Sequence, residues 1–156
     1  YYHQALEVFN QIGYTKGQAL ALQSLAGLLD LLGKYDEAEE KMILALKIAQ
    51  SSSNKYLEKD ILLDLGALYN KRNRHLLALG YFRQALSISE NIDDKRGIES
   101  SMRHTGQTLV YLGRYDEAKP MLIDALEKAK ELNDIRDIQH SHDVLSELYE
   151  ATGHYK

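Results

Sequence analysis

The residues of this sequence that are best suited to chemistry lie near its carboxyl end, in the run His140-Ser-His142-Asp143. Histidine and aspartate both bind zinc, and histidine is also a frequent general base. On a helix, however, residues two apart point to different sides, so His140 and His142 cannot share one metal ion. A site built from His104 and His140 would need further ligands, and Asp143 is the only obvious one. We therefore predict that these side chains hold no metal.

The patterns that would indicate nucleotide binding or catalysis are incomplete. The run Gly13-Tyr-Thr-Lys-Gly17 lacks the spacing of a Walker phosphate loop. The serines at 51–53 are typical of a turn and have no nucleophile elbow around them. Glu39, Glu40 and Glu99 fall on what we predict to be solvated helix faces. We therefore predict that the chain is not an enzyme and uses no cofactor.

Composition narrows the class of partner. The formal net charge is −4, and charged residues are spread along the whole chain rather than gathered into the basic stripe that binds nucleic acid. The densest basic run, residues 71–75, fits a solvated turn between helices. No stretch reaches the ~18 consecutive apolar residues that a membrane helix needs. The absence of cysteine excludes a disulfide framework and is compatible with the cytosol. We expect a cytoplasmic protein that binds neither nucleic acid nor membrane.

An internal repeat organises the chain. The pair Ala-Leu recurs at residues 5–6, 45–46, 85–86 and 125–126, a constant step of 40 residues. The run Gly33-Lys-Tyr-Asp-Glu-Ala38 returns as Gly113-Arg-Tyr-Asp-Glu-Ala118, a step of 80 residues. Such a period indicates a solenoid or an array in which each unit buries its apolar face against its neighbours.

Within a unit the apolar residues have helical spacing, as Leu22, Leu25 and Leu29 illustrate. No alternating strand pattern or hairpin signal is present, so we predict an all-α fold. Each unit is expected to be two antiparallel helices joined at a residue that accepts the left-handed conformation. These residues are Gly33, Asn73, Gly113 and Gly153.

Small residues also recur at two positions of the unit, where we expect two helix backbones to approach closely. In the first helix they are Ala26, Gly66, Gly106 and Ser146; in the second they are Ala38, Ala78 and Ala118. The predicted architecture is an α-solenoid of antiparallel helix pairs, concave on the side of the first helices.

The first unit carries the following spaced residues: Leu22, Leu25, Ala26, Leu29, Gly33, Tyr35, Ala38, Met42 and Ala45. This pattern resembles the signature of the tetratricopeptide repeat family, and residues 102–125 repeat it. The unit is longer than the family's usual ~34 residues. It is similar to the long repeats of bacterial signalling proteins, found beside cyclases, kinases and transcription regulators, and of polarity scaffolds. HEAT and armadillo repeats share the period but lack Gly-x-Tyr-Asp-Glu-Ala. The resemblance implies a protein-interaction superhelix.

We expect the chain to be one solenoid segment of a longer protein. It is predicted to contain a second helix at 2–12, full repeats at 17–56, 57–96 and 97–136, and a partial repeat at 137–156. Apolar residues at both ends lack the repeat that should cover them, as at Val144, Leu145 and Leu148. We therefore expect self-association through these ends.

The resemblance places a peptide or protein ligand in the concave groove. The predicted lining residues are Asp64, Asn70, Lys71, Arg103, His104, Gln107, Tyr111, His140 and Asp143. Arg103 is the predicted anchor for a ligand carboxylate, since guanidinium can pair it through two bonds. Asn70 and Gln107 are expected to bond the ligand backbone. The lysine–asparagine clamp of chaperone-binding members is not reproduced.

A second contact surface is predicted at Leu76, Leu77 and Leu79, where other units carry charged residues. The alternative for these leucines is local packing against the next repeat. The predicted function is a peptide- or protein-docking module. The alternative is a regulatory or oligomerising segment of a larger bacterial signalling protein that carries a cyclase, kinase or transcription-regulator domain.

Overall fold

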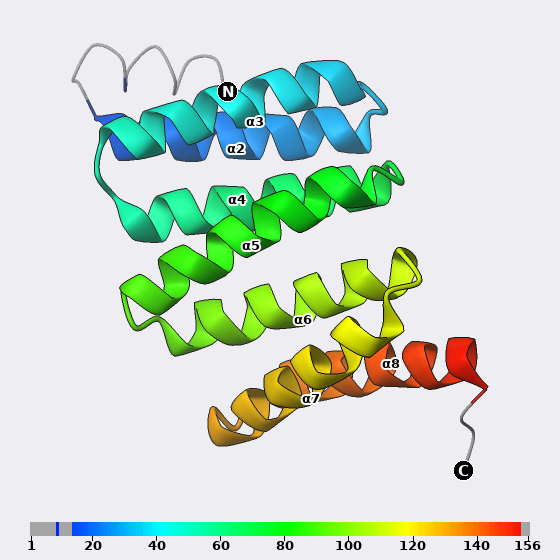
Figure 1. The fold of residues 1–156 in the computed structure, drawn as a ribbon. Coiled ribbons are helices and arrows are strands. Elements are labelled where there is room, and N and C mark those ends of the chain that lie inside the picture. The colour runs from blue at the N-terminus through cyan, green and yellow to red at the C-terminus, as the bar shows by residue number, and fades with distance from the viewer. Residues whose placement is uncertain (1–8, 10–13, 154–156) are drawn as a thin grey trace.

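The computed structural model describes residue 9 and residues 14–153, and this part of the chain forms seven helices and no strand (Figure 1). The helices are α2 (Thr15–Leu31), α3 (Tyr35–Ser51), α4 (Lys55–Lys71), α5 (His75–Asn91), α6 (Lys95–Tyr111), α7 (Tyr115–Glu131) and α8 (Ile135–Thr152). The second helix predicted at 2–12 lies outside the described residues. No helix in the described part is both long and apolar enough to cross a membrane.

The helices stack as antiparallel pairs, α2 with α3, α4 with α5 and α6 with α7, and α8 continues the series (Figure 1). The first helices also touch one another along the stack, α2 with α4, α4 with α6 and α6 with α8. Among the described residues, α3, α5 and α7 make no such contact with one another. First helices therefore line the inner side and second helices the outer side. The predicted all-α solenoid is confirmed.

The turns inside the repeats are closed as predicted. Gly33, Asn73, Gly113 and Gly153 all have positive φ, between 57° and 73°. At Gly33 the backbone N–H of the next residue, Lys34, donates to the carbonyl of Leu29 over 2.9 Å, which ties the helix end to the turn. The turns between repeats use the same conformation at Ser53, Asp93 and Asn133. This conformation was not predicted at these three residues, although aspartate and asparagine are the side chains that accept it most readily.

The small residues Gly66 of α4 and Gly106 of α6 each face a large residue of the partner helix. A Cβ atom at Gly66 would lie 2.6 Å from Cζ of Phe82, and one at Gly106 would lie 2.6 Å from Cδ2 of Leu122. Both distances are far inside van der Waals contact, and both facing side chains are fully buried. The helices can therefore approach this closely only because no side chain stands at these positions.

Two alanine substitutions should change stability in opposite directions. Gly80 lies in α5 with nothing within 4 Å of its Cβ position, so Gly80→Ala should stabilise the fold by about 0.5–1 kcal/mol through helix propensity. Gly66→Ala has the same propensity gain but must displace the Phe82 ring, and should cost a net ~1–3 kcal/mol. Urea denaturation of the two variants measures both effects. Equal midpoints would contradict the close-approach argument.

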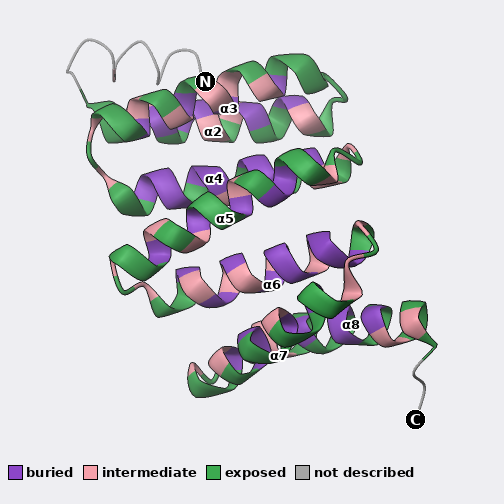
Figure 2. Ribbon diagram, viewed as in Figure 1, coloured by how far each residue is buried: buried purple, intermediate pink, exposed green. Residues whose placement is uncertain are grey.

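The core has two apolar parts, visible as buried strips along the helices in Figure 2. One part joins the helices α2 to α5, and the other joins α6 to α8 together with Leu79 of α5. Between them, α6 buries polar residues: Ser101 and Thr105 stand where α4 has Ile61 and Leu65. The hydroxyl groups of Ser101 and Thr105 have no hydrogen-bond partner among the described residues. The third repeat therefore has a more polar interior than the second.

The prediction of a three-leucine surface is wrong for one of its members. Leu79 is 4% exposed and packs in the second apolar part with Leu109 and Leu122, so it belongs to the core. Leu76 and Leu77 are 72% and 50% exposed. These two leucines remain a predicted contact surface.

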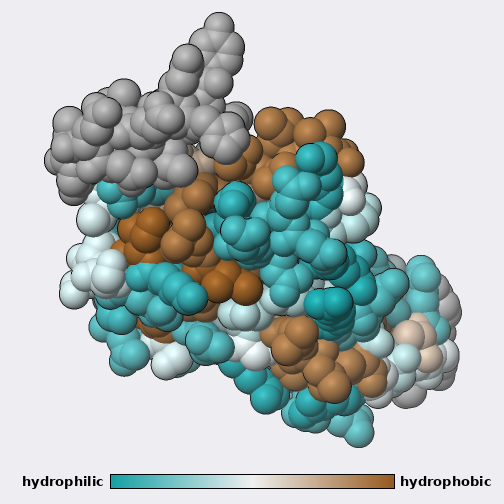
Figure 3. Space-filling view, turned by 90° about the horizontal axis from the view of Figure 1, so that it is seen from above, coloured by the Kyte–Doolittle hydropathy of each residue, from teal (hydrophilic) through white to brown (hydrophobic). Residues whose placement is uncertain are grey.

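The ends of the described helices differ in exposure. Val144, Leu145 and Leu148 of α8 are buried with α7 residues in the second apolar part, so the expectation of bare apolar surface on α8 is wrong. On α2, Leu28 is 42% exposed although Leu68, forty residues later in the same repeat position, is 8% exposed. Seen from above (Figure 3), several hydrophobic patches lie among hydrophilic surface.

Candidate functional site

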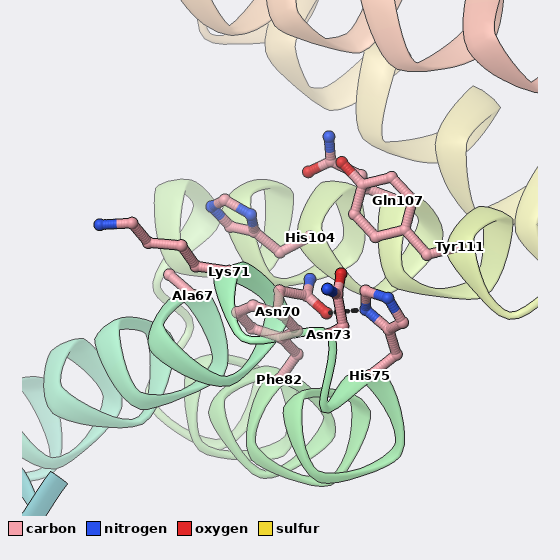
Figure 4. Close-up of a pocket in the computed structure, with 9 residues that line it drawn as sticks. All are labelled: Ala67, Asn70, Lys71, Asn73, His75, Phe82, His104, Gln107 and Tyr111. Carbon is pink, nitrogen blue, oxygen red and sulfur yellow. Dashed lines mark hydrogen bonds between the residues drawn. The ribbon is translucent and has the colours of Figure 1, made fainter. Parts of the chain in front are cut away.

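A hollow of about 450 Å³ lies on the inner side between α4, the start of α5 and α6 (Figure 4). Five of the predicted groove residues line it: Asn70, Lys71, His104, Gln107 and Tyr111. Four further residues also line it: Ala67, Asn73, His75 and Phe82. His75 and Phe82 come from α5, a second helix, although the concave side was predicted to be formed by the first helices. Their contribution shows that the hollow reaches down between the first helices.

Asn70 holds the walls of this hollow together. Its side-chain amide donates to Oγ1 of Thr108 over 2.7 Å, and its side-chain oxygen lies 3.0 Å from Nδ1 of His75. Thr108 in turn donates to the backbone carbonyl of His104 over 2.7 Å. Asn70 therefore connects α4 to α5 and α6, and both ends of its amide already have partners. These bonds give Asn70 a structural role in the walls of the hollow, and its role in bonding a ligand backbone stays a prediction.

Aromatic rings form the rest of the hollow. The imidazole of His104 stacks on the ring of Phe82, with centroids 5.1 Å apart and an angle of 11°. The ring of His75 lies 5.1 Å from that of Tyr111, which is 47% exposed. Burial, together with the charges of Arg103 and His140, lowers the pKa of His104 to about 4. At neutral pH the His104 side chain is therefore an uncharged aromatic surface.

A second hollow, of about 290 Å³, adjoins the first between α2 and α4. The predicted residues Asp64 and Lys71 line it, and Lys71 and Ala67 belong to both hollows. The side chains across its mouth are paired: Gln23 donates to Asp64 over 2.5 Å, and the Lys71 ammonium donates to Asp30 over 2.5 Å. The two hollows together form one groove across the inner faces of α2, α4 and α6.

Arg103 is not available as the predicted ligand anchor. It is 9% exposed and lines neither hollow. Its Nε donates to Oε1 of Glu99 over 3.1 Å, and its Nη2 lies 3.7 Å from Oδ1 of Asp137 on α8. Glu99 is 1% exposed, which corrects the prediction of a solvated face. The spacing of Glu99 and Arg103, four residues apart on one helix, was the sequence signal for this pair.

The remaining predicted residues lie apart from the hollows. His140 and Asp143 are exposed on α8 and line neither of them. His140 is close enough to His104 for its charge to affect the pKa of that imidazole. Within the described residues, no group of three or more histidine, cysteine, aspartate or glutamate side chains could hold a metal ion.

Comparison with known proteins supplies a family for part of the chain. Residues 57–131 match the family model described as tetratricopeptide repeat. No curated protein matches the sequence.

Solved structures share the fold at low identity. Aspartyl phosphate phosphatase F from Bacillus subtilis is 18% identical with a TM-score of 0.88, over 97% of this chain and 41% of that protein. BtubC from P. vanneervenii is 23% identical with a TM-score of 0.78, over 89% of this chain and 58% of that protein. A Rap protein in complex with Competence and Sporulation Factor is 17% identical with a TM-score of 0.78, over 94% and 46%. The chain thus spans about half the length of these proteins, and the likeness is one of fold.

Proposed function

We propose that this chain, a solenoid of tetratricopeptide repeats, is a docking module whose inner groove binds an extended peptide segment of a partner protein. The observation that carries the proposal is the pair of adjoining hollows across α2, α4 and α6. Hollows of this kind receive alternate side chains of an extended segment, while polar groups at the rim bond its backbone. The fold likeness to a Rap protein in complex with Competence and Sporulation Factor supports a binding role.

Two residues of the first hollow are free to contact a ligand. The amide of Gln107 and the hydroxyl of Tyr111 make no hydrogen bond to any residue that the structure describes. Tyr111 is also half-exposed, so its ring can pack on an apolar side chain of the ligand. The bonded Asn70 and the stacked His104 hold a preformed wall beside them, which lowers the ordering cost of binding.

Selection from a random 12-residue peptide library displayed on phage tests the proposal. Tyr111→Ala should weaken the selected peptides about 10- to 30-fold, as loss of a buried aromatic anchor does. Gln107→Ala should weaken them about 2- to 10-fold through one lost hydrogen bond. Gln84→Ala is the matched control, because Gln84 is exposed on the second helix α5 and bonds only the carbonyl of Gly80. Fluorescence anisotropy of labelled synthetic peptides measures the affinities. Normal binding by both groove variants would refute groove binding.

A second candidate function is regulatory: the same groove would report its occupancy to an output domain in a longer protein. The observation favouring it is that the match covers only 41% of aspartyl phosphate phosphatase F and 46% of the Rap protein. In this case a groove peptide should change the activity of the longer protein, and Tyr111→Ala should abolish that response. A response that survives in the Tyr111→Ala variant would leave only the docking function.

A further inference from the structure

We propose that the hollow between α2 and α4 receives a lysine or arginine side chain, so that the ligand is a basic peptide segment with a bulky apolar residue close to its cation. This inference rests on the groove binding proposed above and names the chemistry of the ligand.

The shape of the hollow suits a long side chain. Its floor is apolar and buried, formed by Ala26, Met42 and Leu68. Its open side is bordered by Gly27 and Ala67, both exposed, and a Cβ atom at Gly27 would meet nothing within 4 Å. The methylene stem of a lysine or arginine packs on such a floor while its charged head reaches polar groups at the wall.

The wall provides a carboxylate oxygen that no group has yet bonded. The Asp30 side chain is 16% exposed, and its Oδ2 accepts from the ammonium of Lys71. Its Oδ1 is buried and has no hydrogen-bond partner among the described residues. Buried polar atoms are nearly always bonded, so this oxygen is an unused acceptor. The Lys71 contact also shows that an ammonium group is accommodated beside this carboxylate.

The opposite wall provides a carboxylate without a cation. Asp64 accepts a hydrogen bond from the neutral amide of Gln23, and it forms no ion pair with any residue in the described part of the chain. Burial raises the pKa of Asp64, the Gln23 hydrogen bond lowers it, and the negative charge of Asp60 raises it again. A ligand cation would stabilise the Asp64 carboxylate in a place where water does so poorly.

The charged residues near the hollow also favour a basic ligand. Arg103, the cation expected to attract an acidic ligand, is paired with Glu99 and Asp137 inside the solenoid. Asp143 and Glu147 are exposed on α8 and form no ion pair with described residues. The inner side therefore presents unpaired carboxylates, and a basic segment complements them.

The neighbouring hollow accounts for the apolar part of the ligand. It is lined by the rings of His75, Phe82, His104 and Tyr111, and it shares Ala67 and Lys71 with the acidic hollow. A segment that fills both hollows must therefore carry its cation and a large apolar or aromatic side chain a few residues apart.

The peptides selected from the random library test this chemistry. They should be enriched in lysine or arginine at a fixed distance from a large apolar residue, and their affinity should fall as salt is raised. Asp64→Asn keeps the acceptor for Gln23 but removes the charge, and should weaken the best peptide at least ~10-fold. Replacing the peptide's lysine or arginine by norleucine should cost a similar factor with the wild-type protein and little more with Asp64→Asn.

Two further variants distinguish the effect of the Asp64 charge from the effect of the space in the hollow and from the effect of charges elsewhere on the surface. Gly27→Leu fills the hollow without altering its carboxylates and should also abolish the preference for a basic residue. Asp124→Asn, at an exposed position on the second helix α7, is the matched control and should bind normally. Circular dichroism melts establish that each variant is folded.

The outcomes distinguish this inference from the groove itself. Peptides that need Tyr111 but carry no basic residue, or that bind Asp64→Asn as tightly as wild type, overturn the basic-ligand inference and leave groove binding standing. If no selected peptide needs Tyr111, groove binding fails and the inference fails with it.

Discussion

Arg103→Met is expected to lower the free energy of unfolding by about 3–5 kcal/mol at pH 8, the range for removing one partner of a buried ion pair. The cost arises because Glu99, which is 1% exposed, loses the hydrogen bond from Arg103 Nε. The second oxygen of Glu99 already lacks a partner among the described residues. The link from α6 to Asp137 on α8 is lost as well.

The pH dependence identifies the cause of this loss. Burial already raises the pKa of Glu99, and the charge of Arg103 and its hydrogen bond lower it; without Arg103 only the raising influences remain. A carboxyl group whose pKa is higher in the folded state binds more protons there. Its contribution to stability is present at low pH and is lost as pH rises through the folded pKa. Arg103→Met should therefore be less damaging at pH 5 than at pH 8, by urea denaturation.

Two companion variants make the test specific. Glu99→Gln combined with Arg103→Met removes the buried charge and should recover part of the stability at pH 8. Arg96→Met removes an arginine from the same helix that is 70% exposed and 3.6 Å from Asp134, and should cost only ~0–1 kcal/mol. If Arg103→Met matches Arg96→Met, or if its cost does not vary with pH, then Glu99 is not held by Arg103.

The features predicted correctly from the sequence are those that are determined by residues of a single repeat. The positive φ at Asn73 follows from the residue types that tolerate that conformation. The close approach at Gly66 follows from the recurrence of a small residue at one position of the unit. Both features depend on residues within the same repeat, and the recurrence of the repeat shows which residue types each position accepts.

The features that were missed depend on partners in other helices. Helix periodicity placed Arg103 on the inner side, but it could not show that Asp137 of α8 would lie beside its guanidinium. Similarly, Leu76 and Leu79 lie on one helix three residues apart, yet only Leu79 meets the apolar residues of α6 and α7. In both cases packing between repeats decides whether the side chain is buried or exposed. The residues that surround it lie about 30–40 positions away in the sequence.

Acidification should destabilise the fold through His104. Burial and two nearby positive charges lower its pKa from 6.5 to about 4 in the folded chain. Between these two pH values the unfolded chain binds a proton that the folded chain does not, so stability falls as pH decreases from 6.5 to about 4. A difference of this size corresponds to roughly 3 kcal/mol at 1.36 kcal/mol per pKa unit. Nuclear magnetic resonance should find the His104 ring neutral down to pH 5.

His104→Phe isolates this contribution, because a phenyl ring can keep the stacking on Phe82 and cannot take a proton. Carboxyl groups such as Glu99 and Asp64, whose pKa values burial raises, favour the folded chain at low pH and oppose the effect of His104. They are present in both proteins, so the difference between wild type and variant cancels them. Wild type should lose about 3 kcal/mol more than His104→Phe between pH 7 and pH 4, by urea denaturation. Parallel pH profiles would mean that folding leaves the pKa of the His104 imidazole near 6.5, so that its burial against Phe82 does not exclude the charged form.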